Sequence, residues 1–226
     1  MGATPESILS PSEDGRLPSS EGMRLRELSR ADWPQVLALN LASERHLSAL
    51  DGTRLQYLLS LAHRSLVVEA GGKVVAFAIA IAPGAPYDSR NYRWFAEHLE
   101  RFLYLDRIAV AGSFRRRGIA TQIYDAMELT AGSLGRMVCD VNVEPPNDAS
   151  LAFHAARGYR EIARLEHPEK LVALLSKELE HRTGEAVSES PQAAIEPWRG
   201  TRACDPHAGA PAHPPGGPPR RPHPRP

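Results

Sequence analysis

The stretch LYLDRIAVAGSFRRRGIATQIYDAMELTA, residues 103–131, predicts a strand, a basic turn and a helix in direct succession. Residues 103–110 form a nearly continuous apolar run with β-branched members, which is typical of a strand buried on both faces. Gly112 and Ser113 interrupt this run. After the turn, apolar residues recur at helical spacing from Ile119 to Met127, so a helix begins near Gly118.

The predicted N-terminus of this helix carries three consecutive arginines, Arg115, Arg116 and Arg117. Unpaired backbone N–H groups and the positive end of the helix dipole converge there, so the turn can hold an anion such as phosphate without a metal. Gly118 allows the backbone to approach that anion closely. The alternative is a solvated arginine turn, because runs of charge usually face water.

The spacing Arg115-x-x-Gly118-x-Ala120 resembles the acyl-CoA pyrophosphate loop of the GNAT acetyltransferase superfamily, whose pattern is Gln/Arg-x-x-Gly-x-Gly/Ala. The position of this motif between a buried strand and an amphipathic helix strengthens the match.

A second segment, Asn147-x-x-Ser150-x-x-Phe153-His154-x-x-x-Gly-Tyr, resembles the superfamily's Asn-x-x-Ala/Ser-x-x-Phe/Leu-Tyr-x-x-x-Gly-Phe. Together with YLDRIAV, YDSRNYRWF and VNVEPPNDAS, it resembles a bacterial subgroup of GNAT proteins known mainly as predicted acetyltransferases.

The resemblance covers about residues 23–180 and implies an α/β GNAT fold. Such a fold has a mixed, mostly antiparallel sheet of six to seven strands, with splayed central parallel strands and about four flanking helices. The residue pattern itself predicts the order β, α, α, β, β, β, α, β, α, β, β. The expected strands are 23–28, 66–68, 74–81, 103–110, 137–143, 159–163 and 171–175, and the expected helices are 32–41, 53–63, 118–131 and 149–156.

Both ends of the chain differ in composition from its middle. Residues 1–21 are rich in Ser, Pro, Glu and Gly, and 11 of the 20 prolines lie between positions 191 and 226. Segments of this kind have too few apolar residues to form a core. We therefore predict a disordered leader over 1–21, one acetyltransferase domain over 22–180 and a disordered Pro/Arg/His-rich tail over 181–226.

The charge balance excludes a strong whole-molecule field, because 27 Lys and Arg residues match 27 Asp and Glu residues. Cys139 and Cys204 do not suggest a disulfide framework or a zinc site. No stretch approaches the roughly 18 apolar residues of a membrane span, and the N-terminal residues lack the basic start and apolar run of a signal peptide. We expect a cytoplasmic protein without nucleic-acid or membrane partners and without a metal, and a homodimer is left open.

The resemblance implies that acetyl-CoA lies between the two splayed strands. The main chain at Ile108 and Val110 would bind the pantetheine amides, and the loop 115–120 would bind the pyrophosphate. Splaying leaves unpaired N–H and C=O groups, which a ligand that completes the ladder can satisfy. The implied cofactor contacts are Ile108, Ala109, Val110, Arg115, Arg116, Arg117, Gly118, Ile119, Ala120, Thr121, Asn147, Ser150 and Phe153.

Direct transfer of an acetyl group to an amine requires one group to deprotonate the ammonium and another to protonate the thiolate. The family usually assigns the second task to a tyrosine where this chain has His154, which either donates a proton near neutral pH or only binds CoA. The resemblance implies a base at the position of Tyr104 or in the neighbouring strand at Asp140 or Glu144, and Asp106 is a substitute for Tyr104, since a tyrosine is a poor base at pH 7. Each candidate has a structural hydrogen bond or salt bridge as its alternative role, and ordered water could serve without a dedicated base.

Residues 84–101 form an aromatic-rich insertion before the central strand, which is either a lid over the acceptor or a helix packed on the sheet. The expected acceptor is a primary amine of a small molecule or peptide. The competing class is a non-catalytic acyl-CoA-binding or regulatory module of the same fold, which His154 in place of tyrosine favours. The expected substrate contacts are Asn40, Glu44, Tyr87, Tyr92 and Trp94.

Overall fold

The computed structural model describes residues 22–44 and 47–180, so the expected leader and tail lie outside the described residues. The described chain folds around one seven-stranded sheet with the order β1-β2-β3-β4-β5-β7-β6. β4 and β5 pair in parallel, and the other neighbours pair antiparallel, which confirms the expected mixed sheet. The strands are β1 (Met23–Glu27), β2 (Arg64–Ala70), β3 (Lys73–Ile81), β4 (Leu103–Val110), β5 (Arg136–Glu144), β6 (Arg160–His167) and β7 (Lys170–Glu178).

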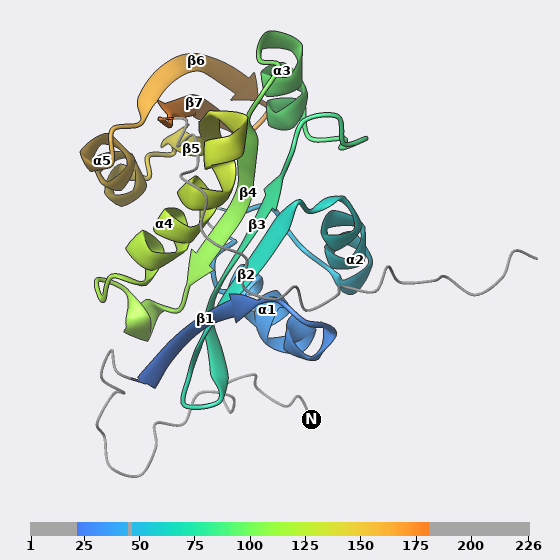
Figure 1. Cartoon of the computed structure of the whole chain (residues 1–226), viewed down its shortest axis with the longest axis vertical. Helices are drawn as coiled ribbons and strands as arrows, with labels where there is room; N and C mark the ends of the chain where they lie inside the picture. Colours follow the sequence, from blue (N-terminus) through green and yellow to red (C-terminus); the bar gives the residue numbers. More distant parts are fainter. Residues whose placement is uncertain (1–21, 45–46, 181–226) are drawn as a thin grey trace, which may run out of the picture. The chain divides into compact units, whose positions relative to one another are not determined.

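Helices cover both faces of the sheet (Figure 1). The described part of the chain also has the short 3-10 turns η2 (Arg30–Asp32), η3 (Gly112–Phe114) and η4 (Gly132–Leu134). The α1–α3 face is covered by α1 (Trp33–Leu41), α2 (Gly52–Leu61) and α3 (Arg90–His98), and the α4–α5 face by α4 (Ile119–Ala131) and α5 (Asp148–Ala156). The described chain thus has five α-helices where about four were expected. The additional helix, α3, belongs to the aromatic insertion.

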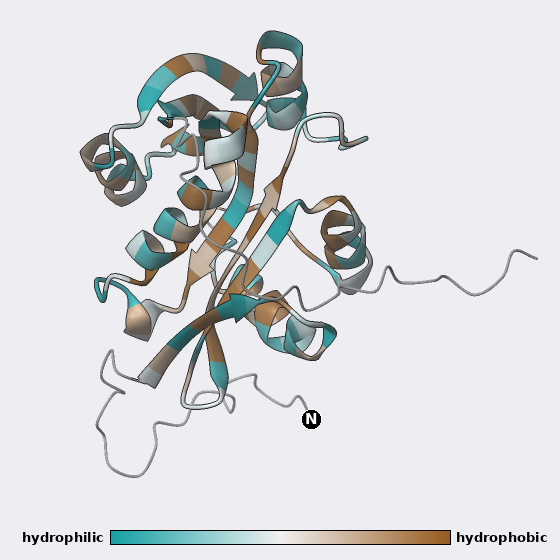
Figure 2. Ribbon diagram, in the orientation of Figure 1, coloured by the Kyte–Doolittle hydropathy of each residue, from teal (hydrophilic) through white to brown (hydrophobic). Residues whose placement is uncertain are grey.

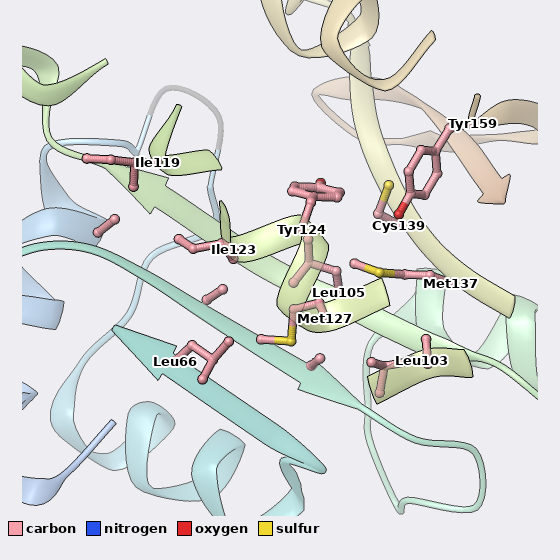
Figure 3. Close-up of a cluster of buried hydrophobic side chains, with 14 of the residues drawn as sticks. Leu66, Leu103, Leu105, Ile119, Ile123, Tyr124, Met127, Met137, Cys139 and Tyr159 are labelled. Carbon is pink, nitrogen blue, oxygen red and sulfur yellow. The ribbon is translucent and has the colours of Figure 1, made fainter. Parts of the chain in front are cut away.

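Each face of the sheet has its own apolar cluster. Helix α4 carries both hydrophobic and hydrophilic residues, as expected for a helix with one face on a sheet (Figure 2). Its buried side chains Ile123, Tyr124 and Met127 lie with Leu105 and Met137 of the sheet (Figure 3). Because Ile123 and Met127 are fully buried, each contributes about 1.5–3 kcal/mol through removal of apolar surface from water.

Strand β4 contains an extra residue, Asp106. Ile79 of β3 pairs with Arg107 and Ala80 pairs with Leu105, so Asp106 has no partner in this register. A bulge of this kind shifts the alternation of side chains by one position. As a result, Asp106 and Arg107 both bind groups on the α1–α3 face, where Tyr104 also lies.

The parallel pairing of β4 with β5 is short. It joins Leu103 with Met137, Tyr104 with Val138 and Leu105 with Cys139, and both strands then continue without further pairing to each other. β4 remains paired with β3, and β5 with β7, so one edge of each strand faces the gap. This gap is the splay that the family resemblance implies. Among the described helices, none combines the length and apolar character needed to cross a membrane.

Candidate active site

A first cavity of about 580 Å³ lies where β4 and β5 separate. Its volume falls in the range of about 300–1,000 Å³ that is usual for small-molecule sites. The second half of β4, the loop before α4, the first half of α4, β5 and α5 supply most of its walls. All of the sequence-predicted cofactor contacts except Arg117 line this cavity. The guanidinium of Arg117 instead lies over the ring of Phe114, 5.2 Å from its centroid.

The loop before α4 has an unusual backbone. Arg116 has φ +58° and Gly118, the N-cap of α4, has φ +76°, so both residues are left-handed. This conformation is rare for a long side chain such as arginine. Left-handed residues next to the unpaired N–H groups of a helix N-terminus form a concavity that binds anions. The side chain of Arg115 turns back to Val110, whose carbonyl oxygen accepts a 3.4 Å hydrogen bond from Nε.

A second cavity of about 300 Å³ lies on the α1–α3 face. It shares Leu47, Asp106, Arg107 and Asp140 with the first cavity, so the two cavities meet at a pair of carboxylates. Three of the predicted base candidates are thereby brought together, since Tyr104 also lines the second cavity, whereas Glu144 lines neither cavity.

The two carboxylates have different surroundings. Asp106 accepts hydrogen bonds from the Tyr87 hydroxyl at 2.6 Å and from Nε of Arg107 at 2.9 Å. This ion pair is buried, with both side chains 5% exposed. Asp140 accepts a 2.6 Å hydrogen bond from the Tyr104 hydroxyl and forms no ion pair with any other described residue. Asp140 is thus the carboxylate that remains available to accept a proton.

Burial raises the pKa of Asp140, and the negative charge of Asp106 raises it further. Hydrogen bonds from Tyr104 and Asn91 and the positive charge of Lys170 oppose this effect without cancelling it. The pKa of Tyr104 is also far above its ordinary value, chiefly because the side chain is buried. Tyr104 therefore stays protonated and acts as a hydrogen-bond donor to Asp140 rather than as a base.

His154 lines the first cavity, but both of its ring nitrogens form hydrogen bonds with neighbouring residues of the protein. Nδ1 lies 2.7 Å from the carbonyl oxygen of Ser150, which can only accept, so Nδ1 carries the proton. Nε2 therefore accepts the hydrogen bond from the Tyr124 hydroxyl at 2.5 Å. Burial lowers the pKa of His154 and raises that of Tyr124, so both are neutral near pH 7. The sequence did not indicate Tyr124, because a tyrosine on the apolar face of a helix is usually a core residue.

The expected substrate contacts Asn40 and Glu44 lie outside both cavities, and Glu44 lies in the turn after α1 rather than on the helix. Asn40 is fully buried, accepts a 2.9 Å hydrogen bond from Arg107 and donates a 3.1 Å bond to the carbonyl of Ser48. It therefore holds Arg107, which in turn holds Asp106. Glu44 is exposed to solvent.

The aromatic insertion contributes to the second cavity through Tyr87 and Asn91. The Tyr92 hydroxyl donates to the carbonyl of Ala82 and accepts from the amide of Ala85, so it fastens the insertion to the core. Trp94 stacks on His98 with ring centroids 4.0 Å apart. Neither Tyr92 nor Trp94 lines either cavity.

Three basic residues of the second cavity, Arg90, His167 and Lys170, were not indicated by the sequence. They come from the start of α3 and from the hairpin that joins β6 and β7. The sequence carries no spacing signal for this group, because packing alone brings the two segments together.

Comparison with known proteins supports the resemblance seen in the sequence. A family model described as acetyltransferase (GNAT) family matches residues 23–159. The search of curated protein sequences gives no significant match.

Solved structures share the fold at low sequence identity. Ard1 from Thermoplasma volcanium superposes with a TM-score of 0.57 at 16% identity, covering 70% of this chain and 98% of that chain. Ribosomal-protein-alanine N-acetyltransferase from Brucella melitensis gives a TM-score of 0.53 at 23% identity, with 69% and 99% covered. The yncA protein from Salmonella typhimurium, solved with its cofactor acetyl-CoA, gives a TM-score of 0.54 at 16% identity, with 74% and 99% covered.

Proposed function

Because the chain belongs to the acetyltransferase (GNAT) family, we propose that it transfers an acetyl group directly from acetyl-CoA to a primary amine of a small molecule or peptide. One observation carries this proposal: two cavities meet at Asp106 and Asp140, where β4 and β5 separate. Such a junction allows a donor in one cavity to meet an acceptor in the other beside a proton-accepting group.

The first cavity fits the donor. The free edges of β4 and β5 offer N–H and C=O groups to an extended ligand that carries amides. The left-handed loop at Arg116 and Gly118 and the N-terminus of α4 suit a pyrophosphate. When bound, acetyl-CoA supplies the acetyl group and a thiolate leaving group.

Asp140 is the proposed base that takes the proton from the acceptor ammonium. A carboxyl whose pKa is raised toward the working pH is a stronger base than an ordinary one. Tyr104 fixes the orientation of this carboxylate through its 2.6 Å hydrogen bond. Asp106 is neutralised by Arg107 and serves to hold Tyr87 in the wall of the second cavity.

Tyr124 is the proposed donor toward the thiolate, and His154 is its positioning residue. Both side chains line the first cavity, and Nε2 of His154 fixes the Tyr124 hydroxyl. His154 has no free ring N–H, because its one proton is held by the Ser150 carbonyl. The hydroxyl of Tyr124 can rotate away from Nε2 and donate a hydrogen bond to the departing thiolate, which it stabilises while keeping its own proton, as its raised pKa requires.

Calorimetric titration with acetyl-CoA tests the donor cavity. Gly118→Asp introduces a carboxylate into the proposed pyrophosphate loop and is expected to weaken binding by at least about tenfold, as expected for losing a charge-assisted interaction. Gly135→Asp is the matched control, because Gly135 has a similar φ of +72° and lies outside the first cavity. Equal affinities for the two variants would contradict the assignment of the loop.

Release of free thiol from acetyl-CoA in the presence of an amine panel tests the transfer itself. Amine-dependent release supports the enzyme. Binding of acetyl-CoA without release by any amine would instead identify an acyl-CoA-binding module.

A further inference from the structure

The second cavity contains charges that are already neutralised by fixed partners. Asp106 pairs with Arg107 at 2.9 Å, and Arg54 pairs with Asp88 at 2.6 Å. These four side chains therefore add little net charge to the space between them. What remains to recognise a ligand is Asp140 and a basic group in the lining of the same cavity.

The basic group consists of Arg90, His167 and Lys170. Arg90 uses one donor on the carbonyl of Glu166 at 2.8 Å. Nε2 of His167 lies 2.9 Å from Oδ1 of Asn91. Burial and the nearby positive charges of Lys170 and Arg90 all lower the pKa of His167, so His167 is neutral near pH 7. Arg90 and Lys170 therefore carry the positive charge of this group.

Lys170 is the residue whose bonding is incomplete. Its side chain is half-buried, and its positive charge acts on Asp140 through space, but its ammonium forms no hydrogen bond or ion pair within the described part of the chain. A partly buried charge is costly unless it is paired. An anion in the second cavity would supply that partner, and Arg90 has further N–H donors for the same anion.

Resting on the proposed transfer, we infer that the acceptor is an amine that carries its own anionic group, as a free amino acid does. Its ammonium binds at Asp140, and its carboxylate or a comparable anion binds at Lys170 and Arg90. This arrangement disfavours polyamines, because a second ammonium would meet two positive side chains. A peptide N-terminus is also disfavoured, because its carbonyl end is an uncharged amide.

Matched acceptors test this inference. Thiol release from acetyl-CoA is measured with a panel of amino acids, with the decarboxylated amine of each, with phosphoethanolamine, with spermidine and with short amidated peptides. We expect kcat/KM for the best amino acid to exceed that of its decarboxylated amine by about 10- to 100-fold, as for a charge-assisted contact. Phosphoethanolamine distinguishes a phosphate from a carboxylate as the preferred anion.

Lys170→Met tests the residue that supplies the contact. The preference for the amino acid over its decarboxylated amine should fall at least about tenfold, mainly through KM, while the affinity for acetyl-CoA stays unchanged. Lys73→Met is the control, because Lys73 is exposed at the start of β3 outside both cavities, so the variant should keep the full preference.

The outcomes separate this inference from the proposed transfer. Equal or better activity with decarboxylated amines, spermidine or peptides would overturn the inference and leave the transfer intact. An unchanged preference in Lys170→Met would also overturn it. Absence of thiol release with every amine would overturn the transfer and this inference with it.

Discussion

Replacing Tyr104 with phenylalanine removes the hydroxyl that donates a 2.6 Å hydrogen bond to Asp140. The ring keeps its packing, since its centroid lies 5.6 Å from that of Phe95 and 5.9 Å from that of Tyr92. A hydrogen bond to a charged group is worth about 1.5–3 kcal/mol, and one pH unit corresponds to about 1.36 kcal/mol. The acidic limb of the kcat/KM profile should therefore move to higher pH by about one to two units.

The sign of this shift follows from the chemistry of the base. Asp140 accepts a proton only as a carboxylate, so activity rises as the pH passes upward through its pKa. The Tyr104 hydroxyl stabilises the carboxylate form. Without it, the carboxylate forms at higher pH, and activity at a given acidic pH is lower.

The assay is kcat/KM for one acceptor amine across pH, since a single acceptor contributes the same titration to every variant. Tyr87→Phe is the matched control, because it removes the 2.6 Å hydrogen bond that the Tyr87 hydroxyl donates to Asp106 in the same cavity. If the acidic limb shifts in Tyr87→Phe and not in Tyr104→Phe, Asp106 rather than Asp140 is the base. Unshifted limbs in both variants would refute proton transfer to either carboxylate.

Three further perturbations have defined outcomes. Tyr124→Phe should lower kcat by about 10²-fold and leave the Kd for acetyl-CoA nearly unchanged in calorimetry; a wild-type kcat would contradict its role as donor beside His154. Asp140→Asn should melt at a higher temperature than wild type at pH 7, since burial raises the pKa of this carboxyl and its charged form destabilises the fold. The difference should shrink as the pH falls through this raised pKa and be smallest below about pH 4, the ordinary pKa of an aspartate. Asp32→Asn should destabilise the fold by about 1.5–3 kcal/mol at pH 7, because two 2.7 Å hydrogen bonds from Arg26 lower the pKa of Asp32. In thermal melts this loss of stability should shrink below pH 4, and a difference that stays constant with pH would contradict the prediction.

The strand, turn and helix of residues 103–131 could be predicted from sequence because their signals are local. A short apolar run predicts a strand, and apolar residues at helical spacing after a glycine predict a helix. The same reasoning predicted the remaining strands of the sheet. The family resemblance of two short motifs on adjoining elements implied many of the residues that line the first cavity.

The bulge at Asp106 could not be predicted, because it depends on the register between β4 and β3. Aromatic content marked Tyr92 and Trp94 but could not indicate that these residues pack away from both cavities. The pairing of Tyr124 with His154 joins α4 to α5, and the basic group of the second cavity joins α3 to the β6–β7 hairpin. Contacts of this kind arise only in the folded chain.

The short pairing of β4 with β5 divides the sheet into two half-sheets, β1–β4 and β5–β7, joined by three residue pairs along the strands. A ligand hydrogen-bonded to both free edges would link the two half-sheets and oppose their separation. A ligand at 100 times its Kd stabilises a fold by about 2.7 kcal/mol. Because each half-sheet supplies one edge, binding of the ligand should slow amide hydrogen exchange in both half-sheets at the same time. The two half-sheets would then open as a single cooperative unit.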